Sequence, residues 1–533
     1  MHRDWVNVHI EGEQEPCSYN WQNVEQWKVI PSPETAILLT TVEELKQEVV
    51  DAKDKELTSL RENDVYEVVD YKGQDTISSR WIFTEKTGGD SRIVKARLVA
   101  RGFEEDSNLL ELRTDSPTCS KHALRSVMVS ASMFNWKINS IDIATAFLQG
   151  NKIQREVYLR PPKDVCPQDK AWRLKRCIYG LNDAPRAWYE RVTEELMSLG
   201  AVRSILDNAM YMWYEGSQLV GHLVSHVDDF VYGGTDQWQE KVIGTIKRKF
   251  KISAESEGSF KYLGLNVVQT TEGISLDQSK YIEELKMIEL HPDRLKEREE
   301  VLTKEERSKL KSLSGQMLWV TNQTRPDMAF ETCVMSNTGK DPTVRKIVDA
   351  NKAVRKIQNS NDVKVKFPPL GKPSDISIVA YGDGTHASLS DGSSQGAFII
   401  FLHGNGKIAP MLWQSKKLKR VTKSPLASEA LSLGETADAG LLIANMVKEI
   451  YKLPAIPQVR CFSDSKSLKD ALYTSNTVED MSLRVSIARM REMVNLGEIS
   501  VKWVEGKRQL ADVLTKKGAS SEALLRVLAC GEL

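Results

Sequence analysis

Two adjacent aspartates, Asp228 and Asp229, interrupt an otherwise apolar stretch of this chain. The stretch reads QLVGHLVSHVDDFVYGG, in which two strand-like apolar runs are separated by a turn at the acids. An antiparallel hairpin would hold at least one of these carboxylates at its tip in a fixed geometry. A third acid, Asp142, lies inside the strand-like segment SIDIATAFL, where apolar neighbours disfavour charge. The fold must therefore provide something that neutralises these acids.

A divalent cation would meet that need. Three carboxylates side by side cost several kcal/mol unless a cation neutralises them. Mg²⁺ prefers such oxygen ligands and keeps water and substrate phosphates as its other ligands. Two ions about 3.5–4 Å apart can activate a hydroxyl and stabilise a departing pyrophosphate in nucleotidyl transfer. The plain alternative is that Asp-Asp is a turn dipeptide and Asp142 a strand-end cap.

The size and charge of the chain narrow the class of protein. A length of 533 residues predicts roughly three to four domains. Lys and Arg total 73, as do Asp and Glu, so any nucleic-acid groove must be made by local charge. The seven cysteines form no CxxC pair, which argues against a zinc site and for a reducing, intracellular setting. No apolar run approaches the roughly 18 residues of a membrane span, and MHRDWVNVHI does not resemble a secretory signal.

Local patterns predict mixed α and β structure in the first half of the chain. Strands are expected in VYEVVDY, ISSRWIFTEK, RIVKARLVARGF, SIDIATAFL and GISL, with a hairpin turn in EKTGGDSR. Helices are expected over 42–61, 121–134, 187–199 and 237–250.

Residues 291–370 are predicted to be mostly charged helices, and KFPPLGKPSD is predicted to be a linker. The strands DISIVAYGDG, GAFIIFLHG, QVRCFSDS and ISVKWVEG then mix with helical text, which predicts an α/β domain of about 160 residues.

Four acids lie on separate elements of this last domain, and they could converge at the ends of adjacent strands. Asp383 follows the strand ISIVAYG, Glu429 is expected in the first turn of a helix, after Ser428, and Asp464 ends the strand VRCFS. Asp512 lies in QLADVLTK. Together they could hold two Mg²⁺ ions that hydrolyse a phosphodiester. Each acid also has a plain alternative as a turn former, a helix N-terminal charge or a surface residue.

The motifs around these acids resemble one family. IDIATAFLQG, CIYGLNDAPRAWYERV, VDDFVYGG and FKYLGL stand in the order of the palm motifs of copia-type reverse transcriptases. RWIFTEK and IVKARLVARGF resemble the fingers, and QMLWVTNQTRPDMAF resembles the connection segment. AYGDGTHAS, LASEALSL, CFSDSKSL and EGKRQLADVLTK resemble the RNase H domain. From about residue 50 to 520, the chain resembles the reverse transcriptase and RNase H portion of a copia-type LTR retrotransposon Pol polyprotein.

The resemblance implies a multidomain α+β and α/β fold, a right-hand (fingers-palm-thumb) polymerase followed by an RNase H-like domain. The implied domains are a polar leader at 1–45, fingers and palm at 46–290, thumb or connection helices and linker at 291–370, and the RNase H-like domain at 371–533. The implied function is that of an RNA-directed DNA polymerase with RNase H activity. It would copy retrotransposon RNA into DNA by two-metal nucleotidyl transfer, with two Mg²⁺ ions per active site and Mn²⁺ as a substitute.

Residue by residue, the resemblance makes Asp142 and Asp228 the main metal ligands of the polymerase and Asp229 the supporting acid. The backbone carbonyl of Ile143 would complete a metal site. Phe147 matches the steric gate that blocks a ribose 2′-OH, so the substrate would be a deoxynucleotide.

The loop with Gly180 and Pro185 would seat the incoming base and the template. Lys95 and Arg97 are candidates to hold the triphosphate, and a solvated strand edge explains them equally well.

In the last domain, the resemblance makes metal ligands of Asp383, Glu429, Asp464 and Asp512. Lys416 and Lys417 open the basic cluster SKKLKRVTKS, which would track the backbone of an RNA–DNA hybrid irrespective of its sequence. A solubilising loop is the alternative.

Four positions depart from the family pattern. His226 stands where an aromatic residue is usual, and Asp183 where Gln is common. Thr385 replaces a second acid, and Ser465 replaces Asn. These departures leave a second hypothesis open, a catalytically decayed copy that only binds nucleic acid, although all seven acids are intact. An RNA-dependent RNA polymerase is disfavoured by Phe147 and by the RNase H-like unit.

The implied partners are an RNA template, a DNA primer, an RNA–DNA hybrid and dNTPs, with no membrane. No CCHC knuckle, protease signature or integrase core is recognisable, so we expect a fragment or processed product that depends on separate integrase, protease and capsid proteins. The implied location is intracellular, in a cytoplasmic virus-like particle, with nuclear delivery of the DNA product.

Overall fold

The computed structural model describes residues 5–8, 17–20, 35–88, 91–105, 112–337, 339–474 and 480–533. The expected leader at 1–45 lies largely outside these residues, as does the centre of the expected hairpin turn, at 89–90. Within the leader, strand β1 (Trp5–Val8) pairs antiparallel with β2 (Cys17–Asn20). The chain forms two compact units, which are described separately. The first unit comprises 1–117, 143–199 and 249–251, and the second comprises 118–142, 200–248 and 252–533.

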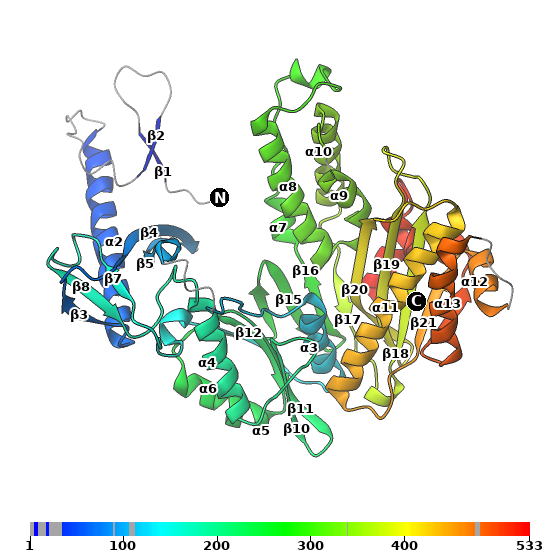
Figure 1. Cartoon of the computed structure of the whole chain (residues 1–533), viewed down its shortest axis with the longest axis horizontal. Coiled ribbons are helices and arrows are strands. Elements are labelled where there is room, and N and C mark those ends of the chain that lie inside the picture. The colour runs from blue at the N-terminus through cyan, green and yellow to red at the C-terminus, as the bar shows by residue number, and fades with distance from the viewer. Residues whose placement is uncertain are drawn as a thin grey trace. The chain divides into compact units, whose positions relative to one another are not determined.

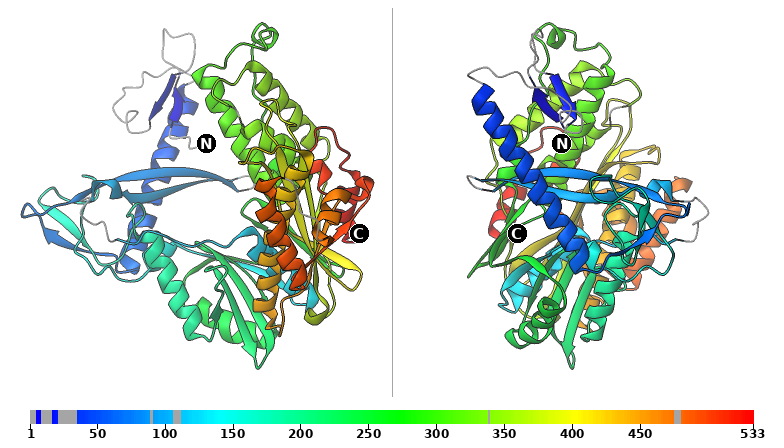
Figure 2. Two further views of the ribbon diagram at one scale, coloured as in Figure 1. Left: turned by 45° about the vertical axis from the view of Figure 1, so that its right-hand side comes forward. Right: turned by 90° about the vertical axis from the view of Figure 1, so that its left-hand side faces the viewer.

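The first unit is built on a five-stranded sheet of order β3-β8-β7-β4-β5. Its strands are β3 (Tyr66–Asp70), β4 (Ile77–Gly88), β5 (Ser91–Ala100), β7 (Tyr158–Arg160) and β8 (Lys170–Leu174). β4 and β5 form the expected hairpin, a long two-stranded ribbon (Figure 2). Helix α2 (Thr35–Glu62) packs on β5 and buries Ala52 and Leu60 at helical spacing. Helix α4 (Ala184–Ser198) replaces the helix expected over 187–199; it begins three residues earlier, and Leu199 is its C-cap.

In the second unit, a six-stranded sheet of order β13-β6-β12-β11-β10-β9 carries the first three acids. Its strands are β6 (Ile138–Ile143), β9 (Val202–Arg203), β10 (Met210–Glu215), β11 (Gln218–His226), β12 (Asp229–Gly234) and β13 (Ile252–Glu257). Helix α3 (Lys121–Met133) begins where the Ser120 hydroxyl accepts the Ala123 N–H.

Two expected elements are interrupted. The strand expected over SIDIATAFL stops at Ile143, because Thr145 adopts a left-handed conformation (φ +47°) that opens a short 3₁₀ helix, η2 (Ala146–Gln149). The helix expected over 237–250 is instead α5 (Asp236–Trp238), a π-helical turn (Gln239–Ile243) and α6 (Gly244–Lys249).

A four-stranded sheet and a set of helices follow. The sheet comprises β14 (Ser259–Tyr262), β15 (Leu265–Thr270), β16 (Gly273–Asp277) and β17 (Val365–Phe367). The helices are α7 (Ser279–Glu283), α8 (Lys304–Gln323), α9 (Ala329–Ser336) and α10 (Val344–Gln358). The expected linker is therefore partly strand, since β17 pairs with β16. Of the helix expected from residue 291 onward, the part before Thr303 forms only the 3₁₀ turn Arg294–Lys296. Helix α8 begins after a capping box at Thr303.

The C-terminal sheet has the order β20-β19-β18-β21-β22. Its strands are β18 (Ser377–Thr385), β19 (Gln395–Gly404), β20 (Lys407–Lys417), β21 (Val459–Ser463) and β22 (Ile499–Trp503). The helices are α11 (Pro425–Tyr451), α12 (Lys466–Tyr473), α13 (Met481–Asn495) and α14 (Glu522–Cys530). α11 lies against β18, β19 and β21 (Figure 1). β18 pairs antiparallel with β19 and parallel with β21.

A buried cation, Arg125 of α3, lies within the second unit. Its guanidinium is 1% exposed and donates to the backbone carbonyls of Met411 (2.8 Å), Asn322 and Gln323 (both 2.9 Å). It also stacks on the Trp413 ring, 3.8 Å from the ring centroid. Arg125 therefore ties α3 to the end of α8 and to β20. Among the helices of the described ranges, none is both long enough and apolar enough to cross a membrane.

Candidate catalytic sites

The hairpin of β11 and β12 presents the first group of acids. Asp229 is the first residue of β12, and its cross-strand partners are Asp142 on β6 and His226 on β11. Asp228 stands in the two-residue turn of the hairpin, next to Val227 at φ +59°, a positive angle that suits a tight hairpin. Asp142 and Asp229 are therefore neighbours across two strands, with Asp228 beside them in the chain. All three side chains are half-buried.

The charges of these acids affect the pKa of a buried tyrosine, Tyr262. Burial raises the pKa of Tyr262 well above its usual value, and the charges of Asp229 and Asp228 raise it further. The Tyr262 hydroxyl contacts the Cys119 Sγ at 3.8 Å, and the Ser253 hydroxyl donates to the backbone carbonyl of Asp142 at 3.1 Å. The carboxylate oxygens of Asp142, Asp228 and Asp229 are of the kind that suits a hard cation such as Mg²⁺.

Several of the expected substrate-binding residues meet in the first unit. The Phe147 ring of η2 contacts the Tyr179 ring edge-to-face with centroids 5.5 Å apart, and the Arg97 guanidinium lies 5.1 Å from the same ring. Lys95 and Arg97 are exposed and lie on one face of β5, since alternate residues of a strand share a face. Tyr179 thus contacts two of the expected substrate-binding residues, Phe147 and Arg97. The sequence did not single it out, although it stands in the motif CIYGLNDAPRAWYERV.

Gly180 follows Tyr179 and is required by its surroundings. Its φ is +91°, and a Cβ there would lie 2.1 Å from the Ala100 carbonyl oxygen. The Ala100 N–H donates to the Tyr179 carbonyl at 2.8 Å, which pins this loop to the end of β5. Pro185 lies in the first turn of α4, where a missing N–H costs nothing. Ile143 is buried and ends β6.

Asp183, one of the departures from the family pattern, has a structural partner. The Arg155 guanidinium contacts a carboxylate oxygen of Asp183 at 3.0 Å and one of Glu105 at 2.6 Å. The pKa of Glu105 is raised, chiefly by burial. The acid at position 183 therefore helps to hold the loop before α4 in place.

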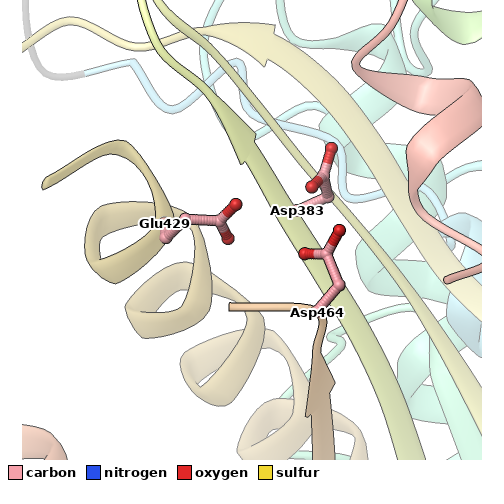
Figure 3. Close-up of side chains that lie close together, drawn as sticks. All are labelled: Asp383, Glu429 and Asp464. Carbon is pink, nitrogen blue, oxygen red and sulfur yellow. The ribbon is translucent and has the colours of Figure 1, made fainter. Parts of the chain in front are cut away.

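Three acids of the C-terminal sheet point toward one another. One ligand oxygen from each of Asp383, Glu429 and Asp464 lies within 4.8 Å of the other two (Figure 3). Asp383 is fully buried on β18, Glu429 lies on α11, and Asp464 directly follows β21. Because β18 and β21 are parallel neighbours, their carboxyl ends meet at one edge of the sheet.

A glycine lets α11 approach this edge. A Cβ on Gly384 would lie 2.4 Å from the Ser428 carbonyl oxygen, so only glycine permits this contact between β18 and the first turn of the helix. The helix begins where the Ser424 hydroxyl accepts the Ala427 N–H, with Pro425 in its first turn. This close packing brings Glu429 over Asp383.

Burial and mutual repulsion perturb these carboxyls. Burial raises the pKa of Asp383 to about 6. Burial, together with the charges of Asp383 and Asp464, raises the pKa of Glu429 to about 9. The pKa of Asp512 is also raised, chiefly by burial. The site thus disfavours negative charge unless a cation is present.

Asp512 joins the group through a lysine. It opens a 3₁₀ turn (Asp512–Leu514), and its Oδ1 lies 2.7 Å from the Lys516 ammonium. That ammonium is also 3.5 Å from Asp383 Oδ1 and 3.9 Å from Asp464 Oδ2. Burial alone would lower the pKa of Lys516, but the charges of Asp383 and Asp512 raise it. Sequence analysis missed Lys516, although it follows Asp512 in QLADVLTK.

The cluster fits a divalent cation. Asp383 Oδ1 and Asp464 Oδ1 are buried and accept no hydrogen bond. Carboxylate oxygens without a hydrogen bond are suitable ligands for Mg²⁺, which binds oxygen at about 2.0–2.1 Å, although the Lys516 ammonium faces Asp383 Oδ1 at 3.5 Å. Asp383, Glu429 and Asp464 would hold the ion, with Asp512 nearby. Within the ranges that the structure describes, they form the single group of three or more candidate ligands this close together.

The remaining expected residues have ordinary partners. Thr385 hydrogen-bonds to Ser388 (2.6 Å), and Ser465 caps α12 by accepting the Leu468 N–H. The ammonium of Lys416 pairs with Glu435 at 2.9 Å, and that of Lys417 pairs with Asp391.

A cavity of about 540 Å³ lies between α8, α9 and β20. Lys417 and Lys419 line it together with Asn322, Asn337 and Gln414. Its described lining contains no acidic side chain, so this surface suits an anion better than a cation.

Comparison with known proteins bears on the first half of the chain most directly. Residues 63–291 match the family described as reverse transcriptase (RNA-dependent DNA polymerase). The chain is 27% identical over 469 residues to the retrovirus-related Pol polyprotein from transposon RE1 of Arabidopsis thaliana, covering 83% of this chain and 30% of that one. It is 25% identical over 501 residues to the Pol polyprotein from transposon TNT 1-94 of Nicotiana tabacum, covering 88% and 37%. The chain thus spans about a third of the length of these relatives.

Two solved structures are also similar. A foamy viral protease-reverse transcriptase in complex with RNA/DNA hybrid aligns with 82% of this chain and 51% of its own, at 12% identity and a TM-score of 0.46. RNase H1 from the halophilic archaeon Halobacterium salinarum NRC-1 aligns with 28% of this chain and 97% of its own, at 20% identity and a TM-score of 0.21. The family match confirms the polymerase part of the expected fold class, and the mixed sheet β20-β19-β18-β21-β22 with its helices confirms that an α/β domain follows it.

Proposed function

Because the chain carries a reverse transcriptase domain over residues 63–291 and is related over most of its length to the Pol polyproteins of copia-type retrotransposons, we propose that it is an RNA-directed DNA polymerase with RNase H activity. It copies a retrotransposon RNA into DNA and removes the copied RNA strand.

One observation carries the polymerase half of the proposal. Asp142 and Asp229 are cross-strand partners beside the turn that holds Asp228, and all three lie inside the matched region. Asp142 and Asp228 hold the metal ions, with the Ile143 carbonyl as a further ligand and Asp229 in support. Two Mg²⁺ ions, or Mn²⁺ in their place, supply activation of the primer hydroxyl and charge stabilisation at the pyrophosphate.

The first unit selects and seats the substrate in this proposal. The Phe147 ring, held against Tyr179, excludes a ribose 2′-OH and so selects dNTPs. Lys95 and Arg97, exposed on one face of β5, bind the triphosphate. The loop of Gly180 and Pro185 receives the incoming base and the template.

The C-terminal acids carry the RNase H half. Asp383, Glu429, Asp464 and Asp512 hold the ions that supply an activated water for phosphodiester hydrolysis. Lys416 and Lys417 are ion-paired to acids of their own domain. The backbone of a hybrid would have to displace Glu435 and Asp391 from these lysines. We therefore propose Lys416 and Lys417 as weak, salt-sensitive contacts.

The wider setting is also a proposal. The polymerase part covers 46–290, helices and linker 291–370, and the RNase H part 371–533, after a leader at 1–45. The partners are an RNA template, a DNA primer and their hybrid, with integrase, protease and capsid proteins supplied separately. DNA synthesis takes place inside the cell, in a cytoplasmic virus-like particle, and the DNA product is delivered to the nucleus.

A primer-extension assay tests the polymerase. We expect Mg²⁺-dependent dTTP incorporation on an RNA template, lost in Asp228→Asn and retained in the matched surface variant Asp236→Asn. Protein that binds primer–template but incorporates nothing at any Mg²⁺ or Mn²⁺ concentration would be a decayed copy. Full activity in Asp228→Asn would refute the site assignment.

A hybrid with labelled RNA tests the second activity separately. Asp464→Asn should abolish cleavage of the RNA strand, whereas Asp470→Asn, a change on the exposed side of α12, should not. Cleavage that survives in Asp464→Asn would show that the acid cluster is not the hydrolytic site.

A further inference from the structure

Lys516 lies in the space where the C-terminal acids would bind a cation. Its ammonium is 2.7 Å from Asp512 Oδ1, 3.5 Å from Asp383 Oδ1 and 3.9 Å from Asp464 Oδ2. One ammonium thus serves three carboxylates on three separate elements. A lysine on an ordinary surface pairs with one acid or none, because each pairing gains little against side-chain entropy.

The backbone holds this lysine in position. The Lys516 N–H donates to the Asp512 carbonyl at 2.9 Å, which closes a tight turn after the 3₁₀ segment. The neighbouring Thr515 hydroxyl donates both to Asp383 Oδ2 and to the Asp512 carbonyl. The turn is therefore fastened to the buried acid itself, and the lysine side chain has a short, fixed tether.

We propose that Lys516 is a tethered counter-ion of the acid cluster, which neutralises Asp383 and Asp464 in the metal-free protein and must leave them when a divalent cation binds. The inference rests on the proposed RNase H function, because that function requires a metal at these acids. It adds that the chain carries a built-in competitor for its own metal.

Steric and electrostatic reasons make the two cations exclusive. A Mg²⁺ ion about 2.0–2.1 Å from an oxygen of Asp383 and one of Asp464 would approach the ammonium closely, and two cations in a poorly solvated site repel strongly. Metal binding therefore includes the displacement of Lys516 toward Asp512 and solvent, where its side chain is already 40% exposed. The lysine raises the metal concentration at which the site fills.

Metal binding to the full-length chain tests this directly. A background protein with Asp142→Asn and Asp228→Asn lacks the two main metal ligands of the polymerase site. Mn²⁺ titrations of it by calorimetry and electron paramagnetic resonance therefore report the C-terminal cluster. We expect Lys516→Gln to bind Mn²⁺ at least fivefold more tightly than the background protein. The matched control is the exposed neighbour Lys517→Gln, which should leave the affinity unchanged, and Lys516→Arg should stay close to the background because it keeps the charge.

Thermal melting gives a readout independent of binding. In EDTA, Lys516→Gln should melt below the background protein because the acids lose their counter-ion, and added Mn²⁺ should raise its melting temperature by more. Equal or weaker Mn²⁺ affinity in Lys516→Gln overturns the inference.

An added Asp383→Asn change separates this failure from failure of the proposed function. If Asp383→Asn removes Mn²⁺ binding and Lys516→Gln has no effect, only the counter-ion inference fails. If both the background protein and Lys516→Gln bind Mn²⁺ no more tightly than Asp383→Asn, the proposed metal site is refuted, and the counter-ion inference is refuted with it. If the metal binds as expected but no RNA is cut, the proposed RNase H activity fails and the inference stands.

Discussion

Glu429→Gln should stabilise the metal-free protein. Burial and the charges of Asp383 and Asp464 raise the pKa of Glu429 to about 9, so its carboxyl is protonated in the folded chain at pH 7.5. In the unfolded chain the same group ionises near its ordinary value of 4.5. Folding must then take up a proton across three pH units at about 1.4 kcal/mol each, an upper limit of about 4 kcal/mol. Glutamine keeps the shape without the ionisation, so we expect a gain of about 2–4 kcal/mol.

The pH dependence follows from the direction of the shift. A carboxyl whose pKa is higher in the folded state leaves stability unaffected below the unfolded value, because both states are then protonated. Stability falls as pH rises from about 4.5 to about 9, where the folded carboxyl ionises as well. The advantage of Glu429→Gln should therefore nearly vanish at pH 4.5 and grow toward pH 9.

Hydrogen exchange of peptides from β18 and α11, measured in EDTA at pH 5 and pH 7.5 with correction for intrinsic rates, reports the free energy of opening for this domain. The matched control is Glu435→Gln on the same helix, whose exposed ion pair with Lys416 should change stability by less than about 1 kcal/mol. No stabilisation at pH 7.5, or the same gain at both pH values, would refute the reasoning. Added Mg²⁺ should stabilise the wild type more than Glu429→Gln, because the ion neutralises the carboxylate that the variant lacks.

Three further changes address other parts of the chain. Arg125→Met leaves three backbone carbonyls without their side-chain donor and should destabilise the second unit by about 3–5 kcal/mol, measured by urea unfolding. The exposed control Arg526→Met should cost less than about 0.5 kcal/mol, and equal losses of stability would contradict the buried role of Arg125. Gly180→Ala forces a Cβ against the Ala100 carbonyl and should destabilise the first unit by more than about 2 kcal/mol, and a normal melting temperature would show that the loop relaxes freely. Phe147→Ala should raise ribonucleotide incorporation at least tenfold in primer extension, and an unchanged preference for dNTPs would remove the gate assignment.

The acids of the C-terminal sheet could be found from the sequence because each ends or follows a recognisable local element. A strand pattern leads to Asp383 and another to Asp464, and the parallel pairing of β18 with β21 brings the two ends together. Glu429 was identified from an expected place in the first turn of a helix, which was wrong in detail, because α11 begins at Pro425 and Glu429 is its fifth residue. The sequence could not supply the close approach of that helix to Gly384, because a glycine inside a strand pattern has many uses.

Two buried or half-buried cations of the second unit, Arg125 and Lys516, could not be predicted from local sequence patterns, for a different reason. Arg125 donates to a carbonyl 286 residues away, and no local pattern distinguishes it from a surface arginine on a helix. Lys516 reaches Asp383 through a turn whose geometry depends on Thr515. Strand β20 was not among the predicted strands. Its Pro410 lies opposite Phe401 at a register irregularity, where a strand tolerates proline.

Helix α11 links the C-terminal acid cluster to the elements around the six-stranded sheet of the second unit. Glu429 is the fifth residue of α11, and the far end of the helix contacts the elements around the sheet that carries Asp142 and Asp229. There the Glu449 carboxylate accepts from the Ser204 hydroxyl and the Ile205 N–H, both at 2.7 Å, and the Tyr451 hydroxyl hydrogen-bonds to Ser130 at 2.9 Å. The 27 residues of the helix extend about 40 Å at 1.5 Å each. These contacts hold the far end of α11 against α3 and the segment before β10, so the helix directly links the two groups of acids in the second unit.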